Sequence, residues 1–262
     1  MGRLCKNLNT HRVKVFSRDI EVTLLLPGKP MNDLFDGLEL DSRSDLFSGI
    51  KKDKQSDIFN AGQGRLLSPG KTLFREGDRA SHCYFVQNGR LKLTKLHEEG
   101  KEAIVRYINP GEITAAVAVF RGKLYPVTAA AVGPTEVIGW DRYTILKLLS
   151  AHPPLAINLL QAAVERLDDV QTRYLELQAE RVEQRIAHAL LRIMRESGRK
   201  TDSGILIDFR LSRQDLADYA GTTLYTVSRT LSRWEKLGWI ATGRERIVVT
   251  DPHALVTFSE SG

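Results

Sequence analysis

Apolar and polar positions change their period along the chain, and the first clear pattern is that of short strands. Between Leu66 and Ile138, apolar residues come in brief runs that are separated by glycines. Regular turn signals between short apolar runs are typical of an antiparallel sandwich or barrel. In residues 87–96, Asn88-Gly89 fits a tight turn, and the residues after it alternate between apolar and polar. We therefore predict a β jelly roll over residues 44–150.

A helical pattern replaces the strands after Asp141. Pro153-Pro154 favours a helix start, because proline is tolerated in the first turn. Apolar or small residues then recur at alternating spacings of four and three, the a/d pattern of a coiled coil. Such a stripe can pack onto the sandwich, but a long helix with a narrow seam between two domains is more typical of a dimer axis. We predict a dimerisation helix over 151–179, with a seam of Ala156, Leu160, Ala163, Leu167, Val170, Tyr174 and Leu177.

Residues 180–262 have the pattern of a smaller domain. A helix is expected at about Glu180–Glu196, because apolar residues recur on one face and Ser197-Gly198 follows. A strand is expected around Ile205–Phe209, then two helices and a hairpin. This order of elements predicts an α+β chain that ends in a winged helix-turn-helix.

The helix pair is expected within residues 211–239. Ser212 suits an N-cap, with Asp215 three residues later as the capping-box acid. Gly221 stands where the chain must turn sharply, and Thr223 suits the cap of the second helix. In a helix-turn-helix this second helix enters the major groove of DNA.

The outer face of the second helix carries the side chains expected to read bases. Val227 and Leu231 are expected to anchor the helix, which leaves Tyr225 and Arg229 outside. A guanidinium can bond guanine O6 and N7 together, so Arg229 is the favoured base reader, whereas the other cations are expected to hold phosphates. The DNA-binding candidates are Ser212, Arg213, Thr222, Thr223, Leu224, Tyr225, Ser228, Arg229, Arg233, Arg244 and Arg246.

The last two of these candidates lie in the predicted wing. Trp239-Ile240 is expected to form one strand, residues 242–245 the turn, and Ile247–Val249 the return strand. Arg244 and Arg246 suit phosphate contacts there, although solvated hairpin charges are nearly as good an interpretation of either one alone.

Composition excludes several classes of protein. The 262 residues are 42% hydrophobic and 27% charged, which is an ordinary globular mixture. The formal net charge of +6 suits a polyanionic partner but decides little alone. The two cysteines, Cys5 and Cys83, exclude an iron–sulfur cluster with four thiolates in a single chain. No apolar run approaches the ~20 residues of a membrane span, so we expect a cytoplasmic protein without a membrane partner.

Residues 1–43 have no clear periodicity. They mix basic residues with a break at 27–30, and Met31 follows directly. We expect an N-terminal extension that is flexible or results from a misassigned start, with a short solvated strand or arm as the alternative.

Sandwich, heptad helix and winged helix-turn-helix in this order resemble the CRP/FNR superfamily of transcription regulators over residues 44–258. The markers are "LFREGD", "VQNGRLKL", "NPGEI" and "LSRQDLADYAGTTLYTVSRTLSRWEKLG". The resemblance implies a cyclic-nucleotide-binding-like jelly roll, a homodimer on a palindromic double-stranded DNA operator, and contact with RNA polymerase. "GTTLYTVSR" and "GRERIVVTDPHAL" are similar to the branch of NnrR-like, nitrogen-oxide-responsive regulators, where an activator is expected.

The sequence departs from cyclic-AMP-binding members of the family. These carry a Gly-Glu pair and an Arg-Ser or Arg-Thr, where this chain has Ala115-Ala116 and Tyr125-Pro126. An alanine side chain cannot accept the ribose hydroxyl, and the arginine that would bind the cyclic phosphate is missing. We therefore expect another effector. The candidate effector pocket consists of Gly111, Glu112, Ala115, Ala116 and Arg121.

The nature of that effector stays open at the sequence level. The NnrR-like resemblance implies nitric oxide or a redox signal, with haem as one cofactor that could sense it and His82, His97 and His152 as candidate axial ligands. A histidine in each of these positions is more typically a surface residue or a satisfied core residue than a haem ligand. Cys83 fits either a redox-active thiol or a small buried hydrophobe.

The alternative class is a small-molecule-binding or metal-dependent jelly-roll protein. Such a site needs clustered histidines and carboxylates. The predicted strands offer no His-x-His pair, and the chain has no Ser/His/Asp or phosphate-loop motif. We therefore expect a regulator and not an enzyme.

Overall fold

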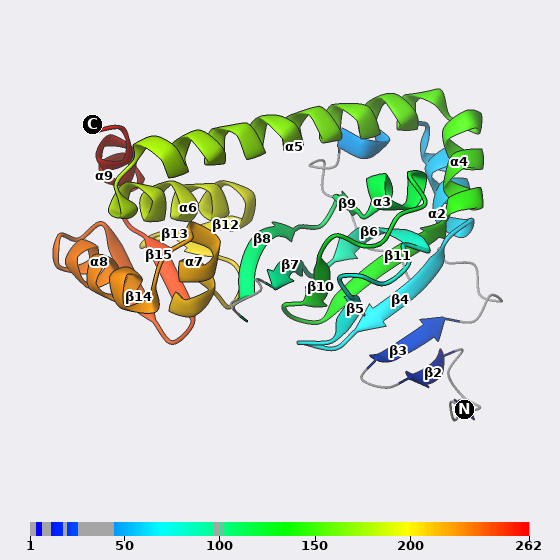
Figure 1. Ribbon diagram of the computed structural model, residues 1–262, viewed down its shortest axis with the longest axis horizontal. Helices are drawn as coiled ribbons and strands as arrows, with labels where there is room; N and C mark the ends of the chain where they lie inside the picture. Colours follow the sequence, from blue (N-terminus) through cyan, green and yellow to red (C-terminus); the bar gives the residue numbers. More distant parts are fainter. Residues whose placement is uncertain are drawn as a thin grey trace. The chain divides into compact units, whose positions relative to one another are not determined.

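The computed structural model describes residues 4–6, 12–17, 20–25, 45–96, 100 and 102–261. The chain divides into two compact units, the first made of Met1–Lys95 with Tyr107–Glu165 and the second of Leu96–Arg106 with Arg166–Gly262. The long helix α5, Pro153–Ala179, passes through this boundary (Figure 1). No helix within the described ranges is both long and apolar enough to span a membrane.

Two sheets build most of the first unit, and residues 102–106 of strand β8 count with the second unit. One has the strand order β1-β2-β3-β4-β11-β6-β9 and the other the order β5-β10-β7-β8. Neighbours pair antiparallel along β4-β11-β6-β9 and along β5-β10-β7, which confirms the predicted jelly roll. The strands are β4 Gln63–Leu67, β5 Thr72–Phe74, β6 His82–Asn88, β7 Leu91–Leu96, β8 Glu102–Ile108, β9 Ile113–Thr114, β10 Thr128–Ala131 and β11 Thr135–Asp141.

The core of this unit lies where four helical segments meet the larger sheet. The Phe85 ring of β6 contacts Phe47 edge to face and Phe59 at a tilt. The Trp140 ring of β11 lies beside the Phe85 ring. The Trp140 indole donates to the Ile58 carbonyl at 2.9 Å, so its polar atom is satisfied in the core. The helical segments are η1 Asp45–Phe47, α2 Lys52–Asn60, α3 Ala116–Phe120 and α4 Arg142–Ala151.

The predicted tight turn between β6 and β7 is confirmed. Gly89 has φ +77°, and a Cβ there would lie 2.2 Å from the Pro134 carbonyl oxygen. Glycine is required at this position both for the backbone conformation and for the close approach.

The structure also describes strands within the predicted N-terminal extension. They are β1 Leu4–Lys6, β2 Arg12–Ser17 and β3 Ile20–Leu25. β3 pairs with β4 through Thr23 opposite Leu66. This pairing fits the alternative interpretation of residues 1–43, a short strand or arm. A flexible or misassigned extension over residues 1–43 stays a prediction.

A small helical domain with one sheet makes up the second unit beyond α5. Helix α6, Val182–Ser197, buries Ile186, Leu190 and Ile193 and packs against the helix pair and the C-terminal helix (Figure 1). The expected strand near 205–209 ends at Ile207, and two elements were not predicted: strand β12 and helix α9. The remaining elements are β12 Gly198–Thr201, β13 Gly204–Ile207, α7 Arg213–Ala220, α8 Leu224–Lys236, β14 Ile240–Gly243, β15 Arg246–Val249 and α9 Pro252–Glu260.

Candidate DNA-binding interface

The turn between α7 and α8 is fixed by local hydrogen bonds. Ser212 Oγ accepts from the Asp215 amide at 2.9 Å, and Asp215 Oδ2 accepts from the Ser212 amide at 3.2 Å. Gly221 follows α7 with φ +65°, and the Thr222 amide donates to the Ala217 carbonyl at 3.0 Å. The predicted capping box and turn glycine are confirmed, and the glycine is needed because a left-handed residue ends the helix.

Helix α8 has one buried and one exposed face. Thr223 Oγ1 accepts from the Thr226 amide at 3.2 Å and begins the helix, as predicted. Val227, Leu231 and Trp234 are fully buried, and each contributes about 1.5–3 kcal/mol by leaving water. On the other face, Leu224 and Arg229 are exposed and Tyr225 is 74% exposed, whereas Ser228 is half-buried. The fold is therefore held without the outer side chains, which are open to a partner.

Arg229 makes only weak contacts within the chain. Its guanidinium lies 3.7 Å from Glu183 Oε1 of α6 and 6.0 Å from the centre of the Tyr225 ring. Exposed ion pairs of this kind contribute about 0–1 kcal/mol, so Arg229 can turn toward a base edge at little cost. Glu183 was not among the predicted site residues, because its contact joins positions far apart in the sequence.

The wing is tied to α8 by one carboxylate. Strands β14 and β15 pair from Ile240–Val249 to Gly243–Arg246, which confirms the predicted hairpin. Glu235 of α8 accepts from the Thr242 amide at 2.8 Å and from its hydroxyl at 2.9 Å, and these bonds lower the Glu235 pKa. Glu235 is a second positioning residue that the sequence alone did not reveal.

Two predicted phosphate-binding arginines line the space between the helix pair and the wing, and a third lies at the wing turn. A cavity of about 330 Å³ opens there, with Arg213, Leu224 and Arg246 in its lining, and Arg244 is exposed at the wing turn. Arg233, also exposed, lies with its guanidinium 5.6 Å from the Phe258 ring centre of α9. Arg213, Arg244 and Arg246 thus belong to one stretch of surface, whereas Arg233 contacts the C-terminal helix.

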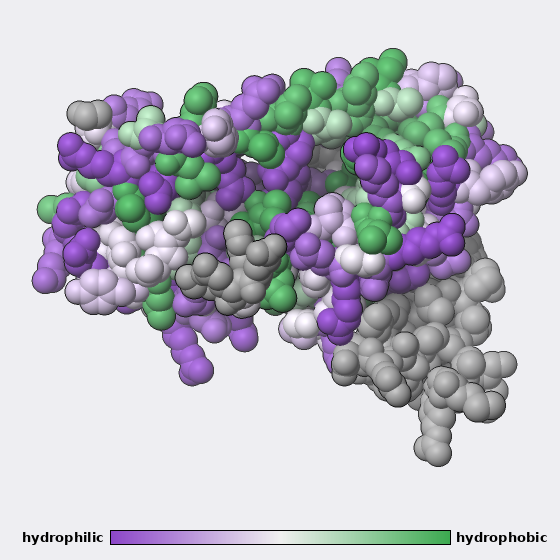
Figure 2. Space-filling model, in the orientation of Figure 1, coloured by the Kyte–Doolittle hydropathy of each residue, from purple (hydrophilic) through white to green (hydrophobic). Residues whose placement is uncertain are grey.

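The predicted dimer seam is exposed along α5. Leu160 is 65% exposed and Tyr174 is 60% exposed, and Leu167, Val170 and Leu177 are also open to solvent. Ala163 is exposed and Ala156 half-buried. Figure 2 shows hydrophobic atoms gathered along this helix. A helix with this much exposed apolar surface is typical of a subunit interface.

The candidate effector pocket forms a turn before α3. Gly111 has φ +89° and donates to the Val86 carbonyl at 2.8 Å. Glu112 Oε2 accepts from the Asn109 amide at 2.6 Å, so this carboxylate is engaged within the turn. Ala115 has φ +65°, an unusual conformation for a residue with a Cβ, and precedes the buried Ala116. Arg121 is exposed at the end of α3.

A groove lies at the segment that follows α3 in the same unit. It has a volume of about 510 Å³ and is lined by Glu76, Gly77 and residues 122–126, so it includes none of the five predicted pocket residues. Tyr125, which stands near the family's arginine position, is buried. Its hydroxyl donates to the His82 carbonyl at 2.8 Å and its ring stacks on Phe74. This side chain is directed into the core and offers no cation to a cyclic phosphate.

His82, His152 and Cys83 were considered for haem or redox sensing, and none of the three lines the two cavities above. His82 is half-buried with Nδ1 3.0 Å from Ser81 Oγ, and His152 ends α4. His97 lies outside the described residues. Burial raises the pKa of Cys83 to about 12, which favours the buried hydrophobe over a reactive thiolate. Haem ligation by these histidines stays a prediction.

Comparisons with known proteins agree with this architecture. A cyclic nucleotide-binding domain matches residues 65–152, and a Crp-like helix-turn-helix domain matches residues 184–258. The transcriptional activator protein FnrA of Stutzerimonas stutzeri is 30% identical over 70% of this chain and 75% of its own. The cyclic AMP receptor protein of Thermus thermophilus is 29% identical over 72% of this chain and 84% of its own.

A solved structure supports the same fold. FixK2 from Bradyrhizobium japonicum has a TM-score of 0.67 at 23% identity and covers 77% of this chain and 98% of its own. The chain therefore belongs to the CRP/FNR family of transcription regulators, with an effector-binding domain and a DNA-binding helix-turn-helix.

Proposed function

We propose that this regulator acts as a homodimer that pairs through α5 and places two copies of α8 on a palindromic operator. The observation that carries the proposal is the outer face of α8, where Leu224, Tyr225 and Arg229 are exposed while the opposite face buries Val227, Leu231 and Trp234. A twofold protein meets half-sites about one helical turn, 10 bp, apart. Arg229 bonds a guanine edge, and Arg213, Arg244 and Arg246 contact phosphates.

The DNA-binding part is tested with Arg229→Ala in the full chain. We expect a loss of about 1–3 kcal/mol, or roughly 5- to 150-fold, in affinity for a selected operator, with little change on random DNA. The matched control is Arg199→Ala, which removes an equally exposed arginine of the same domain that pairs with Asp208. Equal operator affinity of the two variants would contradict the assignment.

The dimer part is tested with Leu167→Glu on α5. This change places a charge in the proposed seam, so sedimentation should show monomers where the parent chain is dimeric. Leu124→Glu is the control, because Leu124 is equally exposed but belongs to the effector-binding domain. A parent chain that sediments as a monomer at micromolar concentration would refute the proposed seam.

The effector is proposed to differ from cyclic AMP. Ala115 and Ala116 offer no side-chain acceptor, and Tyr125 is buried where the family carries arginine. Titration calorimetry with cyclic AMP should therefore give no heat of binding, and micromolar binding would overturn this point.

Nitric oxide is proposed as the first signal to test, on the strength of the NnrR-like motifs. An absorption spectrum with and without haem and nitric oxide decides whether haem is the sensor. Because His82 and His152 line neither cavity, we expect no Soret shift that depends on either residue.

The alternative of a metal-dependent jelly roll gains no support. Among the described residues, the one group of metal-ligand side chains that lie close together comes from α5, the connection after it and α6, outside the sheets.

A further inference from the structure

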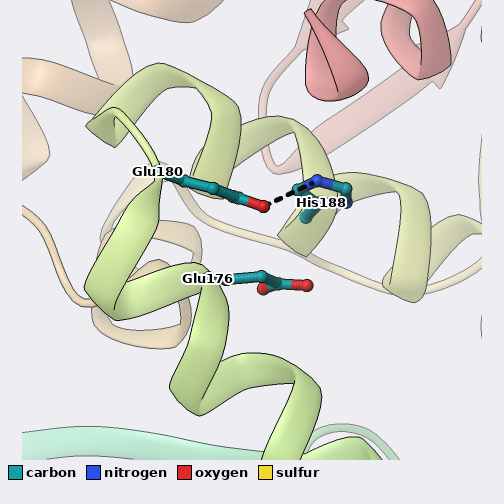
Figure 3. Close-up of side chains that lie close together, drawn as sticks. All are labelled: Glu176, Glu180 and His188. Carbon is teal, nitrogen blue, oxygen red and sulfur yellow. Dashed lines mark ion pairs between the residues drawn. The ribbon is translucent and has the colours of Figure 1, made fainter. Parts of the chain in front are cut away.

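Three potential metal ligands meet where α5 connects to α6. They are Glu176 of α5, Glu180 directly after that helix and His188 of α6, and their ligand atoms all lie within 4.8 Å of one another (Figure 3). The Glu180 amide donates to the Glu176 carbonyl at 3.0 Å, so the chain keeps its helical course to Glu180, and the spacing of four residues places the two glutamates on the same side. Helix α6 runs back past that face after the break at Arg181, which brings in the imidazole.

The polar atoms of this group are incompletely satisfied. His188 Nε2 lies 3.2 Å from Glu180 Oε1, but Glu180 Oε2 is buried and has no hydrogen-bond partner among the described residues. A buried carboxylate oxygen without a donor carries an unfavourable desolvation cost. A cation next to this oxygen would remove that cost.

Glu176 is held in place by a neighbouring cation. Arg192 donates to its two carboxylate oxygens at 2.6 and 2.9 Å, and the Glu176 side chain is only 9% exposed. A carboxylate has about four lone-pair positions, so Glu176 can keep Arg192 and still offer a lone pair to an ion. Ligating carboxylates are commonly oriented by such second partners.

We propose that Glu176, Glu180 and His188 form a binding site for a divalent transition-metal ion, with Zn²⁺ as the best match. One imidazole and two carboxylates are a ligand set that Zn²⁺ accepts, with a water in the fourth position. At metal–ligand distances of about 2.1 Å, tetrahedral ligands stand about 3.4 Å apart, so small side-chain rotations close the site. A harder ion such as Mg²⁺ prefers six oxygens and fits this set less well.

Such an ion would join the last turns of α5 to the first helix of the DNA-binding domain. The site goes beyond the proposed function, because its occupancy is measured without DNA. If DNA binding failed while zinc bound, only the proposed function would be refuted.

The test is zinc binding by the full-length chain, measured against a chromogenic chelator. We expect one Zn²⁺ per chain at the site, and at least tenfold weaker binding in His188→Ala and Glu180→Gln. The control is His253→Ala, which removes an exposed histidine of α9 and should bind zinc like the parent. Circular dichroism melting of each metal-free variant checks that it is folded. If His188→Ala unfolds, the zinc affinity of the nearly isosteric Glu180→Gln variant tests the site.

Two results would overturn the site. One is a parent chain that does not compete with the chelator. The other is a folded Glu180→Gln or His188→Ala variant that binds zinc as tightly as His253→Ala, because the ion would then be held elsewhere.

Discussion

Replacing Glu183 by glutamine should increase the affinity of the protein for DNA. Glu183 lies in the first turn of α6, and its carboxylate is 3.7 Å from the Arg229 guanidinium on the outer face of α8. Under the proposed function, DNA binding must replace this contact with a base contact. Glu183 therefore competes with DNA for Arg229, and its negative charge also repels nearby phosphates.

The expected gain follows from the exposure of the pair. The Arg229 side chain is 63% exposed and that of Glu183 29%, so solvent screens the attraction. Exposed pairs contribute about 0.2–1 kcal/mol, which corresponds to roughly a 1.4- to 5-fold gain in affinity when the competitor is removed. Because Glu183 also favours the positive N-terminus of α6, its neutralisation should lower the stability of the free protein by about 0.3–1 kcal/mol.

The assay is fluorescence anisotropy with a labelled operator at two salt concentrations, together with thermal melting. Asp202→Asn is the matched control, because it removes an exposed acidic charge from the β12–β13 turn of the same domain. The decisive comparison is a double-mutant cycle, in which Glu183→Gln should give no gain once Arg229 is alanine. Weaker binding by Glu183→Gln would mean that Glu183 orients Arg229 for DNA, and the reasoning above would be refuted.

Three further changes test the effector-binding domain by thermal or urea unfolding. Ala115→Gly should raise the free energy of unfolding by about 0.5–1 kcal/mol, because φ +65° strains a residue with a Cβ; an unchanged midpoint would contradict this. Trp140→Phe should cost about 1–3 kcal/mol, since the Ile58 carbonyl loses its buried donor; a smaller effect would mean that another donor replaces the indole. Asp141→Asn should cost less than about 1 kcal/mol near neutral pH, because asparagine can still cap α4 by accepting from the Thr144 amide. The hydrogen bonds from Thr144 lower the pKa of Asp141 in the folded protein. The stabilisation that the Asp141 charge provides is therefore present above the unfolded-state pKa and is lost as pH falls through the folded-state pKa. An equal difference in unfolding free energy between parent and variant at pH 2 and pH 7 would refute this.

Elements with strong local signals were predictable from the sequence. Pro153 marks the start of α5 and Gly221 the end of α7, because each residue has a backbone preference that suits only such positions. Strand β12 and helix α9 were not predicted. β12 is a polar edge strand whose existence depends on pairing with β13, and α9 is short and gains its stability from packing on α6.

The residues of the candidate site also fall into those that local sequence signals reveal and those that only the fold reveals. The caps at Ser212 and Thr223 were predictable, because each depends on residues three positions away. The contacts Glu183–Arg229 and Glu176–Arg192 join separate helices, so their partners become visible only when the chain is folded. Glu176, Glu180 and His188 were not predicted as a group, because His188 meets the two glutamates only in the folded chain.

The two-faced construction of α8 separates what keeps the domain folded from what it recognises. Val227 and Leu231 are held in the core, while Leu224 and Tyr225 contribute little to it. Substitutions at the outer positions can therefore accumulate without penalty to folding. During evolution, the preferred promoter sequence of such a protein can drift while its scaffold stays constant, and an engineer can retarget it by exchanging a few outward-facing side chains.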